Sequence, residues 1–373
     1  MIRSTISGLP GVNAFERTAT GFGLRREAKR HAALAGADEV SKSGVAAALC
    51  HRSPKSRSVL ARERARIARA GLADCRLCAH ECGVNRLVGE AGLCHAGAEA
   101  RIFMAQAEVS DELELIPTFA IALSGCDLRC DFCITGGPSW NPRAGEPLSV
   151  AAAPRRREGG GDALVAARGG GAAFTGLRRG VAATLQLRRL SGLERLIRQA
   201  EQALADGART IMILGGEPTI HLPAALEIVA ALPDDAKLVW KTNAHGSAQA
   251  RELLDGIFDV WLADFKFGND ACAQRLAKVP DYIRVVRGNL LWANEHSELM
   301  VRHLLMPGHV ECCWQPVAEW LAANLPGVKV NLRSGFWPAW HSARHNDLRR
   351  TVSNSESEQA GRIARNCGLN LVE

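Results

Sequence analysis

The chain has 373 residues, a net charge of +7 and 47% apolar residues, so it is long enough for one large α/β domain with extensions. No stretch reaches the roughly 18 to 20 consecutive apolar residues of a membrane-spanning helix, and the N-terminus lacks the apolar core of a signal peptide. These features predict a cytoplasmic protein without a membrane partner.

The positive charge is concentrated in two segments. Residues 1–70 carry a net charge of +9 and residues 151–190 carry +6, which leaves −8 for the remainder of the chain. The part that holds the motifs described below is therefore acidic. This distribution gives little support for a nucleic-acid partner.

Residues 1–73 form a basic segment with little periodicity, for which we expect a flexible extension. A basic helix is predicted near Val59–Ala70. An Arg-rich, acid-poor start is typical both of organellar transit peptides and of flexible bacterial extensions, and both interpretations stay open.

Cysteines dominate the next segment, residues 74–118. Cys75, Cys78, Cys82 and Cys94 are spaced C-x2-C-x3-C-x11-C, and twelve cysteines in all favour metal or cluster ligation in a reducing compartment over disulfides. The four thiols could bind a tetrahedral zinc ion or an iron–sulfur cluster, with His80 and His95 as substitute ligands. The alternative is a reduced segment without metal.

From Phe119 to the C-terminus, apolar runs alternate with amphipathic stretches of helical length, which predicts consecutive βα units. Strands are predicted at Phe119–Leu123, Thr210–Leu214, Lys237–Lys241, Val260–Phe265, Leu299–Leu305 and Val328–Leu332. Helices are predicted at Gly192–Asp206, Pro223–Leu232, Ala248–Gly256, Tyr282–Asn294, Pro316–Asn324 and Glu356–Cys367, the last one after a polar loop at Arg344–Asn354.

These units predict an α/β fold, a partial (β/α)6 TIM-like barrel over residues 119–373, with a Cys-rich N-terminal segment and a flexible basic extension. Residues 151–189 are a low-complexity mixture of Ala, Gly and Arg that does not fit a barrel. They could be an exposed insertion, a gene-model error or a lid over the substrate.

Three further cysteines follow the first predicted strand. Cys126, Cys130 and Cys133 have C-x3-C-x2-C spacing on one short loop. Four cysteines normally complete a [4Fe-4S] cluster, so three leave one iron open to an outside ligand. A zinc site or a chance cluster of buried thiols is the alternative.

This loop, with the aromatic Phe132 before its third cysteine, resembles the signature of the radical S-adenosylmethionine (SAM) superfamily. The resemblance implies a [4Fe-4S] cluster on Cys126, Cys130 and Cys133, whose open iron binds the amino and carboxylate groups of SAM. It also implies an electron donor such as flavodoxin or ferredoxin, and release of a 5′-deoxyadenosyl radical from SAM. No side chain is assigned a catalytic role of its own, because the cofactors supply the chemistry.

The second strand ends in Gly215, Gly216, Glu217 and Pro218, which resemble the superfamily's GGE motif. Glycines allow close backbone approach to a ligand, and a carboxylate can accept hydrogen bonds from the SAM ammonium group. A plain strand-to-helix turn is the alternative.

The next two strands end in polar residues. Thr242 and Asn243 follow the third strand, and Asp264 and Lys266 follow the fourth. Active sites assemble at strand C-termini of βα barrels, and similarity to glycyl-radical-enzyme activases implies that these residues surround the methionyl part of SAM or an ion. They could instead cap the strand ends, and Lys241 departs from those activases, which have an acidic residue there.

The fifth strand contains Arg302 in a segment similar to the R-x-x-x-x-P-G segment of those activases. Arg302 is therefore a candidate partner of the SAM carboxylate or ribose, with a structural salt bridge as the alternative. His303 faces the opposite side by strand alternation and is interpreted as structural.

Together the motifs resemble the radical SAM subgroup related to pyruvate formate-lyase activating enzyme, over residues 74–333 except the insert. The remaining cysteines lack motif context and are interpreted as core or surface thiols: Cys50, Cys272, Cys312, Cys313 and Cys367.

Three functions follow as hypotheses. The first is an activase-like enzyme that abstracts hydrogen from a partner protein. The second is radical SAM modification of a small molecule or peptide. The third is a non-catalytic iron–sulfur or zinc protein, which would leave the polar strand ends unexplained.

Overall fold

The computed structural model describes residues 56–109, 112–148 and 191–372. The predictions for residues 1–55 and for the insert 151–189 lie outside the described residues. None of the helices in this described part is long and apolar enough to cross a membrane.

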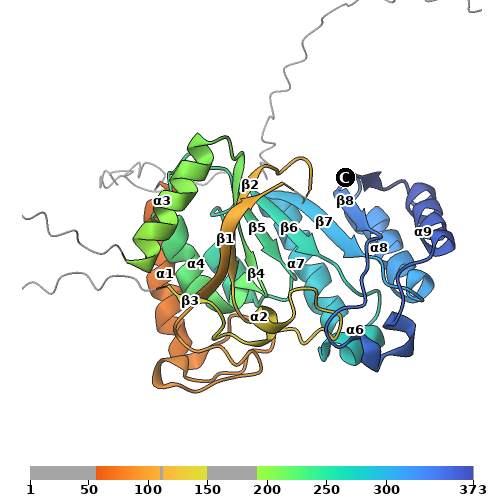
Figure 1. Cartoon of the computed structure of the whole chain (residues 1–373), viewed down its shortest axis with the longest axis horizontal. Helices are drawn as coiled ribbons and strands as arrows, with labels where there is room; N and C mark the ends of the chain where they lie inside the picture. The colour runs from red at the N-terminus through yellow and green to blue at the C-terminus, as the bar shows by residue number, and fades with distance from the viewer. Residues whose placement is uncertain (1–55, 110–111, 149–190, 373) are drawn as a thin grey trace, which may run out of the picture. The chain divides into compact units, whose positions relative to one another are not determined.

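A single nine-stranded sheet runs through the structure (Figure 1), in the order β3-β1-β2-β4-β5-β6-β7-β8-β9. The strands are β1 (Arg101–Glu108), β2 (Thr118–Leu123), β3 (Glu146–Pro147), β4 (Thr210–Gly215), β5 (Leu238–Thr242), β6 (Val260–Asp264), β7 (Glu298–Leu304), β8 (Lys329–Arg333) and β9 (Asn370–Leu371). From β2 to β9 all neighbours pair in parallel, and β1 pairs antiparallel with both β2 and β3. The sheet is not closed, so the predicted partial barrel with six parallel βα strands is confirmed.

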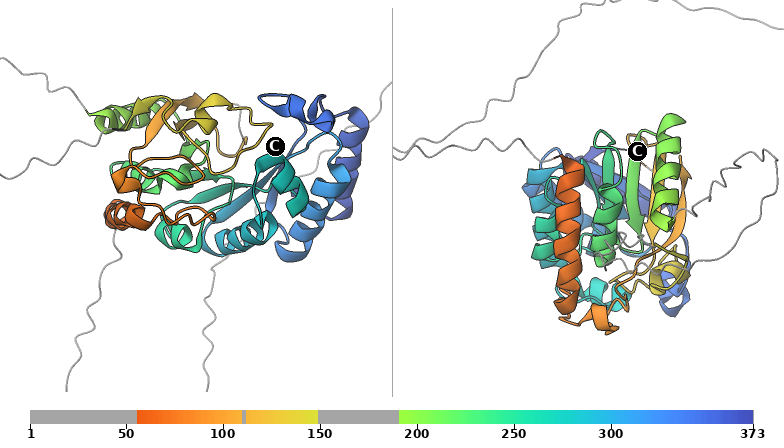
Figure 2. Two further views of the ribbon diagram at one scale, coloured as in Figure 1. Left: turned by 90° about the horizontal axis from the view of Figure 1, so that it is seen from below. Right: turned by 90° about the vertical axis from the view of Figure 1, so that its left-hand side faces the viewer.

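The helices account for the connections between these parallel strands. They are α1 (Arg57–Ala70), α2 (Gly137–Trp140), α3 (Gly192–Ala205), α4 (Leu222–Val229), α5 (Ala248–Leu254), α6 (Asp270–Ala277), α7 (Tyr282–His296), α8 (Gln315–Asn324) and α9 (Asn354–Asn366). Capping boxes start α3 at Ser191 and Glu194 and α9 at Ser353 and Glu356, which satisfies the first amide groups of both helices. The left view of Figure 2 shows helices along one side of the curved sheet.

Alternation along the strands divides the sheet into two faces. Trp240 and Val301 pack into the large core shared with the helices. The other face carries a small apolar cluster that includes Met212, Val239 and Met300. Two residues further along β5 and β7, the same face carries charged side chains, so its apolar part ends where the strands approach their C-termini.

Several elements of the fold were not predicted from the sequence, among them β1, α2, α6 and the two-residue strands β3 and β9. Strand β1 is half-buried and lies next to the short edge strand β3, and α6 is a short helix between β6 and α7. In addition, α1 packs against α4, to which Arg69 forms an ion pair of 2.9 Å with Glu227, and Arg57 at the start of α1 forms one of 2.8 Å with Asp259 before β6. The end of the basic segment is thus a helix of the barrel's outer layer.

Candidate functional site

The loop after β2 carries three cysteines at the C-terminal edge of the sheet. Cys126 and Cys130 are buried and Cys133 is half-buried. Backbone amides of the loop are held by α6, because Arg129 donates to the Ala277 carbonyl over 2.9 Å and Asp131 to the Leu276 carbonyl over 2.9 Å. The thiols therefore sit on a fixed backbone.

The glycine pair at the end of β4 is required by the backbone of this loop. A Cβ on Gly215 would lie 2.0 Å from the Leu123 carbonyl oxygen, and one on Gly216 would lie 2.0 Å from the Gly125 carbonyl oxygen. The Gly216 amide donates to Leu123 over 3.0 Å and the Glu217 amide to Gly125 over 2.9 Å. The ladder between β2 and β4 thus continues into the cysteine loop, which needs residues without side chains.

The sulfur atoms of the loop are too far apart for a single metal ion. A tetrahedral ion with metal–sulfur bonds of about 2.3 Å holds its thiolates about 3.8 Å apart. In residues 56–109, 112–148 and 191–372, two groups of three or more ligand atoms lie within 4.8 Å of one another, and neither contains Cys126, Cys130 or Cys133. The loop fits a multi-iron cluster in which each thiolate binds its own iron.

The free thiols resist ionisation in this environment. Burial raises the pKa of the Cys126 thiol well above its usual value and raises the pKa of Cys130 to about 12. A metal that bound these thiols would therefore have to displace their protons.

Glu217 organises the ends of three neighbouring elements. Its Oε1 accepts hydrogen bonds from the Thr219 amide, the Thr219 hydroxyl and the Thr242 hydroxyl over 3.1, 2.6 and 2.8 Å, and its Oε2 accepts from the Asn243 amide over 2.7 Å. Burial and the nearby charge of Asp127 raise the pKa of Glu217 to about 7, although the hydrogen bonds oppose this shift. The Glu217 carboxylate thus links the end of β4 to the end of β5, next to the cysteine loop.

Asp127 and two histidines form a second buried polar group that the sequence did not predict. The Asp127 carboxylate accepts a hydrogen bond from the side-chain amide of Asn243 over 2.7 Å and lies 2.8 Å from His245 Nδ1. Burial opposes its ionisation, but these hydrogen bonds outweigh burial and lower its pKa. The His80 ring lies edge-on to His245 with 5.1 Å between centroids, which brings the N-terminal Cys segment against the cysteine loop.

A charged network lies on the concave face beside the loop. Asp264 pairs with Lys266, and Arg302 lies 3.5 Å from Asp264 and 3.4 Å from the buried Glu112. Burial opposes both charges, yet Lys266 and Arg302 lower the pKa of Asp264, and Asp264 raises the pKa of Lys266. The network stays ionised near neutral pH.

Comparison with known families agrees with this geometry. The radical SAM superfamily model matches residues 121–321, which is more than half of the chain and contains all three loop cysteines. The chain belongs to the radical SAM superfamily. The family implies a [4Fe-4S] cluster and SAM, and the predicted resemblance is confirmed at this level.

The radical SAM chain is also similar to individual proteins. It is 26% identical over 299 residues to the uncharacterized protein MJ0674 of Methanocaldococcus jannaschii, which covers 80% of this chain and 76% of that protein. A solved domain of pyruvate-formate lyase-activating enzyme from Bacteroides vulgatus has 20% identity and a TM-score of 0.36, covering 44% of this chain and 97% of that domain. Streptococcus suis SuiB bound to its precursor peptide SuiA has 14% identity and a TM-score of 0.38, covering 48% of this chain and 41% of SuiB.

The N-terminal Cys segment of this radical SAM protein does not converge on a point. Cys75, Cys78 and Cys94 are buried and Cys82 is exposed. Although the structure describes all four, they are absent from the groups whose ligand atoms lie within 4.8 Å of one another. No three of these sulfur atoms therefore lie as close together as the ligands of one zinc ion do.

A cavity of about 490 Å³ opens beside the radical SAM site. It is lined on one side by Ile134, which directly follows Cys133, and on others by Arg302, Arg333 and Trp337. The cavity is therefore continuous with the charged face of the sheet.

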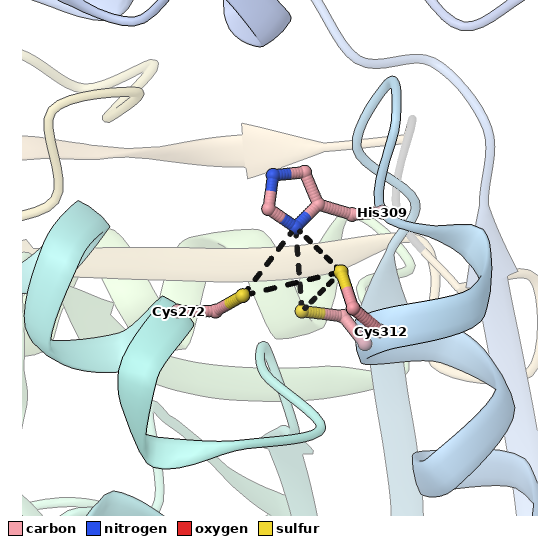
Figure 3. A group of neighbouring side chains, drawn as sticks. Cys272, His309 and Cys312 are labelled. Atoms are coloured by element: carbon pink, nitrogen blue, oxygen red, sulfur yellow. Dashed lines mark hydrogen bonds between the residues drawn. The ribbon is translucent and has the colours of Figure 1, made fainter.

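One prediction about the cysteines needs correction. Cys272, Cys312 and Cys313, interpreted from the sequence as core or surface thiols without a shared site, gather with His309 into one group of possible metal ligands (Figure 3). Cys367 stays apart and half-buried, and Cys50 lies outside the described residues. The gathering was missed because 40 residues separate Cys272 from Cys312 in the sequence.

Proposed function

We propose that this protein is a radical SAM enzyme that cleaves SAM reductively on a [4Fe-4S] cluster bound by Cys126, Cys130 and Cys133. The observation that carries the proposal is the loop of three widely spaced thiols fixed at the C-terminal edge of the parallel sheet. When bound, the cluster and SAM supply one-electron cleavage of SAM to methionine and a 5′-deoxyadenosyl radical, which takes a hydrogen atom from the substrate.

The chain's own residues would position SAM next to that loop. Gly215, Gly216 and Pro218 form the narrow turn against which a flat ligand could lie. Glu217 holds Thr242 and Asn243 in place, and its contact with the SAM ammonium remains part of the proposal. This assignment gives the GGE turn a positioning role as well as a binding role.

The charged network suits a zwitterionic ligand. Lys266 and Arg302 offer cations and Asp264 an anion within one cluster of side chains that are about four-fifths buried, with exposed fractions of 20% each. SAM carries an ammonium, a carboxylate and a sulfonium, so both signs of charge find partners. We propose Asp264, Lys266 and Arg302 as SAM-binding residues.

The substrate would enter the cavity beside Ile134. Arg333 favours a substrate with a carboxylate or another anionic group, and Trp337 and Phe336 offer apolar walls. An activase-like reaction on a partner protein and modification of a peptide or small molecule remain the two substrate hypotheses. A dependence of SAM cleavage on an added small molecule would favour the second.

The N-terminal group Cys75, Cys78, Cys82 and Cys94 is proposed as a second iron–sulfur or metal site. It lies next to Asp127 through His80, so an electron donor such as flavodoxin or ferredoxin could approach from this side. None of the described cysteines is in a disulfide, and we expect the reducing cytoplasm for such a chain.

The experiment is anaerobic reconstitution with iron and sulfide, followed by dithionite and SAM and quantification of 5′-deoxyadenosine. Wild-type protein should bind SAM and form product, while Cys126→Ala should form none. Cys367→Ser is the matched control and should behave as wild type. Cluster-loaded wild type that neither binds nor cleaves SAM would leave a non-catalytic metal protein as the better description.

A further inference from the structure

A compact group of metal-ligating side chains lies outside the radical SAM site. Cys272 comes from the first turn of α6, and Cys312 and Cys313 come from a single π-helical turn, Val310–Trp314, that leads into α8. His309 directly precedes that turn. Figure 3 shows the side chains converging on one point between the two elements.

The distances within the group match the edges of a tetrahedron around one ion. The Sγ atoms of Cys272, Cys312 and Cys313 lie 3.7, 3.2 and 3.5 Å from His309 Nδ1. Cys312 Sγ lies 4.0 Å from Cys272 Sγ and 3.9 Å from Cys313 Sγ. Bonds of about 2.3 Å to sulfur and about 2.0 Å to nitrogen place sulfur atoms about 3.8 Å apart and sulfur and nitrogen about 3.5 Å apart.

A carboxylate orients the histidine for this role. His309 Nε2 lies 3.0 Å from Asp347 Oδ2, and Arg275 in turn donates to both oxygens of Asp347 over 3.3 and 2.6 Å. Arg275 Nη2 also lies 3.1 Å from His309 Nε2. An ion bound at Nδ1 requires the hydrogen on Nε2, and Asp347 Oδ2 is placed to accept it. Carboxylate–histidine pairs of this kind support metal-bound histidines.

The backbones of α6 and of the π-helical turn lie close enough together for the four side chains to meet. A Cβ on Gly268 would lie 2.4 Å from the Cys313 carbonyl oxygen, so the loop before α6 touches the π-helical turn directly. Asn269 caps α6 and donates from its side chain to the Cys312 carbonyl over 2.7 Å. The contact between the two elements is thus built into residues that flank the ligands.

We propose that Cys272, His309, Cys312 and Cys313 bind one zinc ion. Three thiolates and one imidazole in tetrahedral arrangement are a typical zinc set, and the spacing is too small for a cubane cluster. All four positions are filled by protein, so the ion is structural. The site does not depend on the proposed SAM chemistry.

The zinc ion links the ends of β6 and β7 to the cysteine loop. It joins α6 to the segment after β7, and the carbonyls of Leu276 and Ala277 at the other end of α6 hold the loop around Cys130. Loss of zinc should therefore loosen the iron-binding loop as well as its own site.

The test is the zinc content of anaerobically purified full-length protein, measured by mass spectrometry together with iron. Wild type should hold about one zinc ion per chain, with an X-ray absorption spectrum of three sulfur ligands and one nitrogen ligand. Cys312→Ser, at an exposed ligand, should lose most of the zinc, and Asp347→Asn should weaken zinc affinity against a chelator by about 10- to 100-fold.

A control variant separates this site from an unrelated cysteine. Cys367→Ser should keep the zinc of the wild type. The proposal is overturned if purified wild type lacks zinc, if Cys312→Ser keeps it, or if the thiols are found as a disulfide. The absorption spectrum of the wild type decides the ligand set even where a variant fails to fold.

Discussion

The side-chain amide of Asn243 donates to Asp127 over 2.7 Å, which joins the end of β5 to the residue directly after Cys126. The same amide lies 3.8 Å from Cys126 Sγ. Because Glu217 also accepts from the Asn243 backbone, this residue links the GGE turn to the cysteine loop.

Replacement of Asn243 by Ala should therefore loosen the loop. Asp127 would lose one of the hydrogen bonds that keep its buried carboxylate ionised, and we expect a loss of about 1–3 kcal/mol in the free energy of unfolding. Iron content after reconstitution should fall in parallel. Asn366→Ala, at an exposed helix end, serves as the control, and equal iron retention in the two variants would contradict the link.

Replacement of Gly216 by Ala tests the backbone contact between β4 and the cysteine loop. The new Cβ would overlap the Gly125 carbonyl, so the loop must shift, and we expect loss of cluster binding even where the barrel still folds. Iron and sulfide analysis with circular dichroism would measure both effects. Gly288→Ala provides the comparison, because its Cβ would lie 3.8 Å from the nearest side-chain atom, and it should keep its cluster.

Replacement of Arg302 by Gln removes the positive charge that lies beside the carboxylates of Asp264 and Glu112, of which Glu112 is fully buried. We expect a loss of about 3 kcal/mol in denaturant unfolding and weaker SAM binding, with smaller losses for Arg302→Lys. Arg333→Gln, on the same cavity, should leave SAM binding near the wild-type value. Unchanged stability and SAM affinity in Arg302→Gln would remove Arg302 from the site.

We predict that His303 makes the free energy of unfolding depend on pH. It is buried, its Nδ1 lies 2.6 Å from the Phe265 carbonyl, and burial lowers its pKa to about 4. The folded state thus holds the neutral ring, so this contribution is complete above the unfolded pKa of about 6.5 and is lost as the pH falls toward 4.

Between pH 7.5 and pH 5, wild type should lose about 2 kcal/mol more than His303→Gln in the free energy of unfolding. Urea unfolding at both pH values would measure this difference. His296→Gln, at an exposed histidine, should follow the wild type. A pH response of His303→Gln equal to that of wild type would show that the ring is not held neutral.

The bounds of the six parallel strands were predicted from the sequence to within one or two residues. Strands buried on both faces form apolar runs that end in polar residues, and such runs can be recognised in a sequence. Strand β1 was not predicted because it is only half-buried and its apolar run, residues 102–105, covers only half of its length. Helix α6 was not predicted because it is short and because its apolar residues Cys272, Ala273 and Leu276 give only a weak helical periodicity.

The parts of the site that could be predicted from the sequence are the motifs whose residues are neighbours in the chain. The loop cysteines and the GGE turn are contiguous, whereas the contacts of Asp127 with His245 and of Asp131 with His345 join residues more than 100 positions apart. Glu217 illustrates the difference. The motif suggested a ligand contact, but the partners Thr242 and Asn243, 25 and 26 residues further along the chain, meet Glu217 only when the strand ends lie together.

Asp131, in the middle of the cysteine loop, accepts from His345, 214 residues further along the chain. During synthesis the three cysteines leave the ribosome long before that partner exists. The loop can take its final form only after nearly the whole barrel has been made. If the loop binds the proposed cluster, we expect iron and sulfide to enter late in the maturation of this protein, and a product truncated before His345 to bind less iron than the full chain.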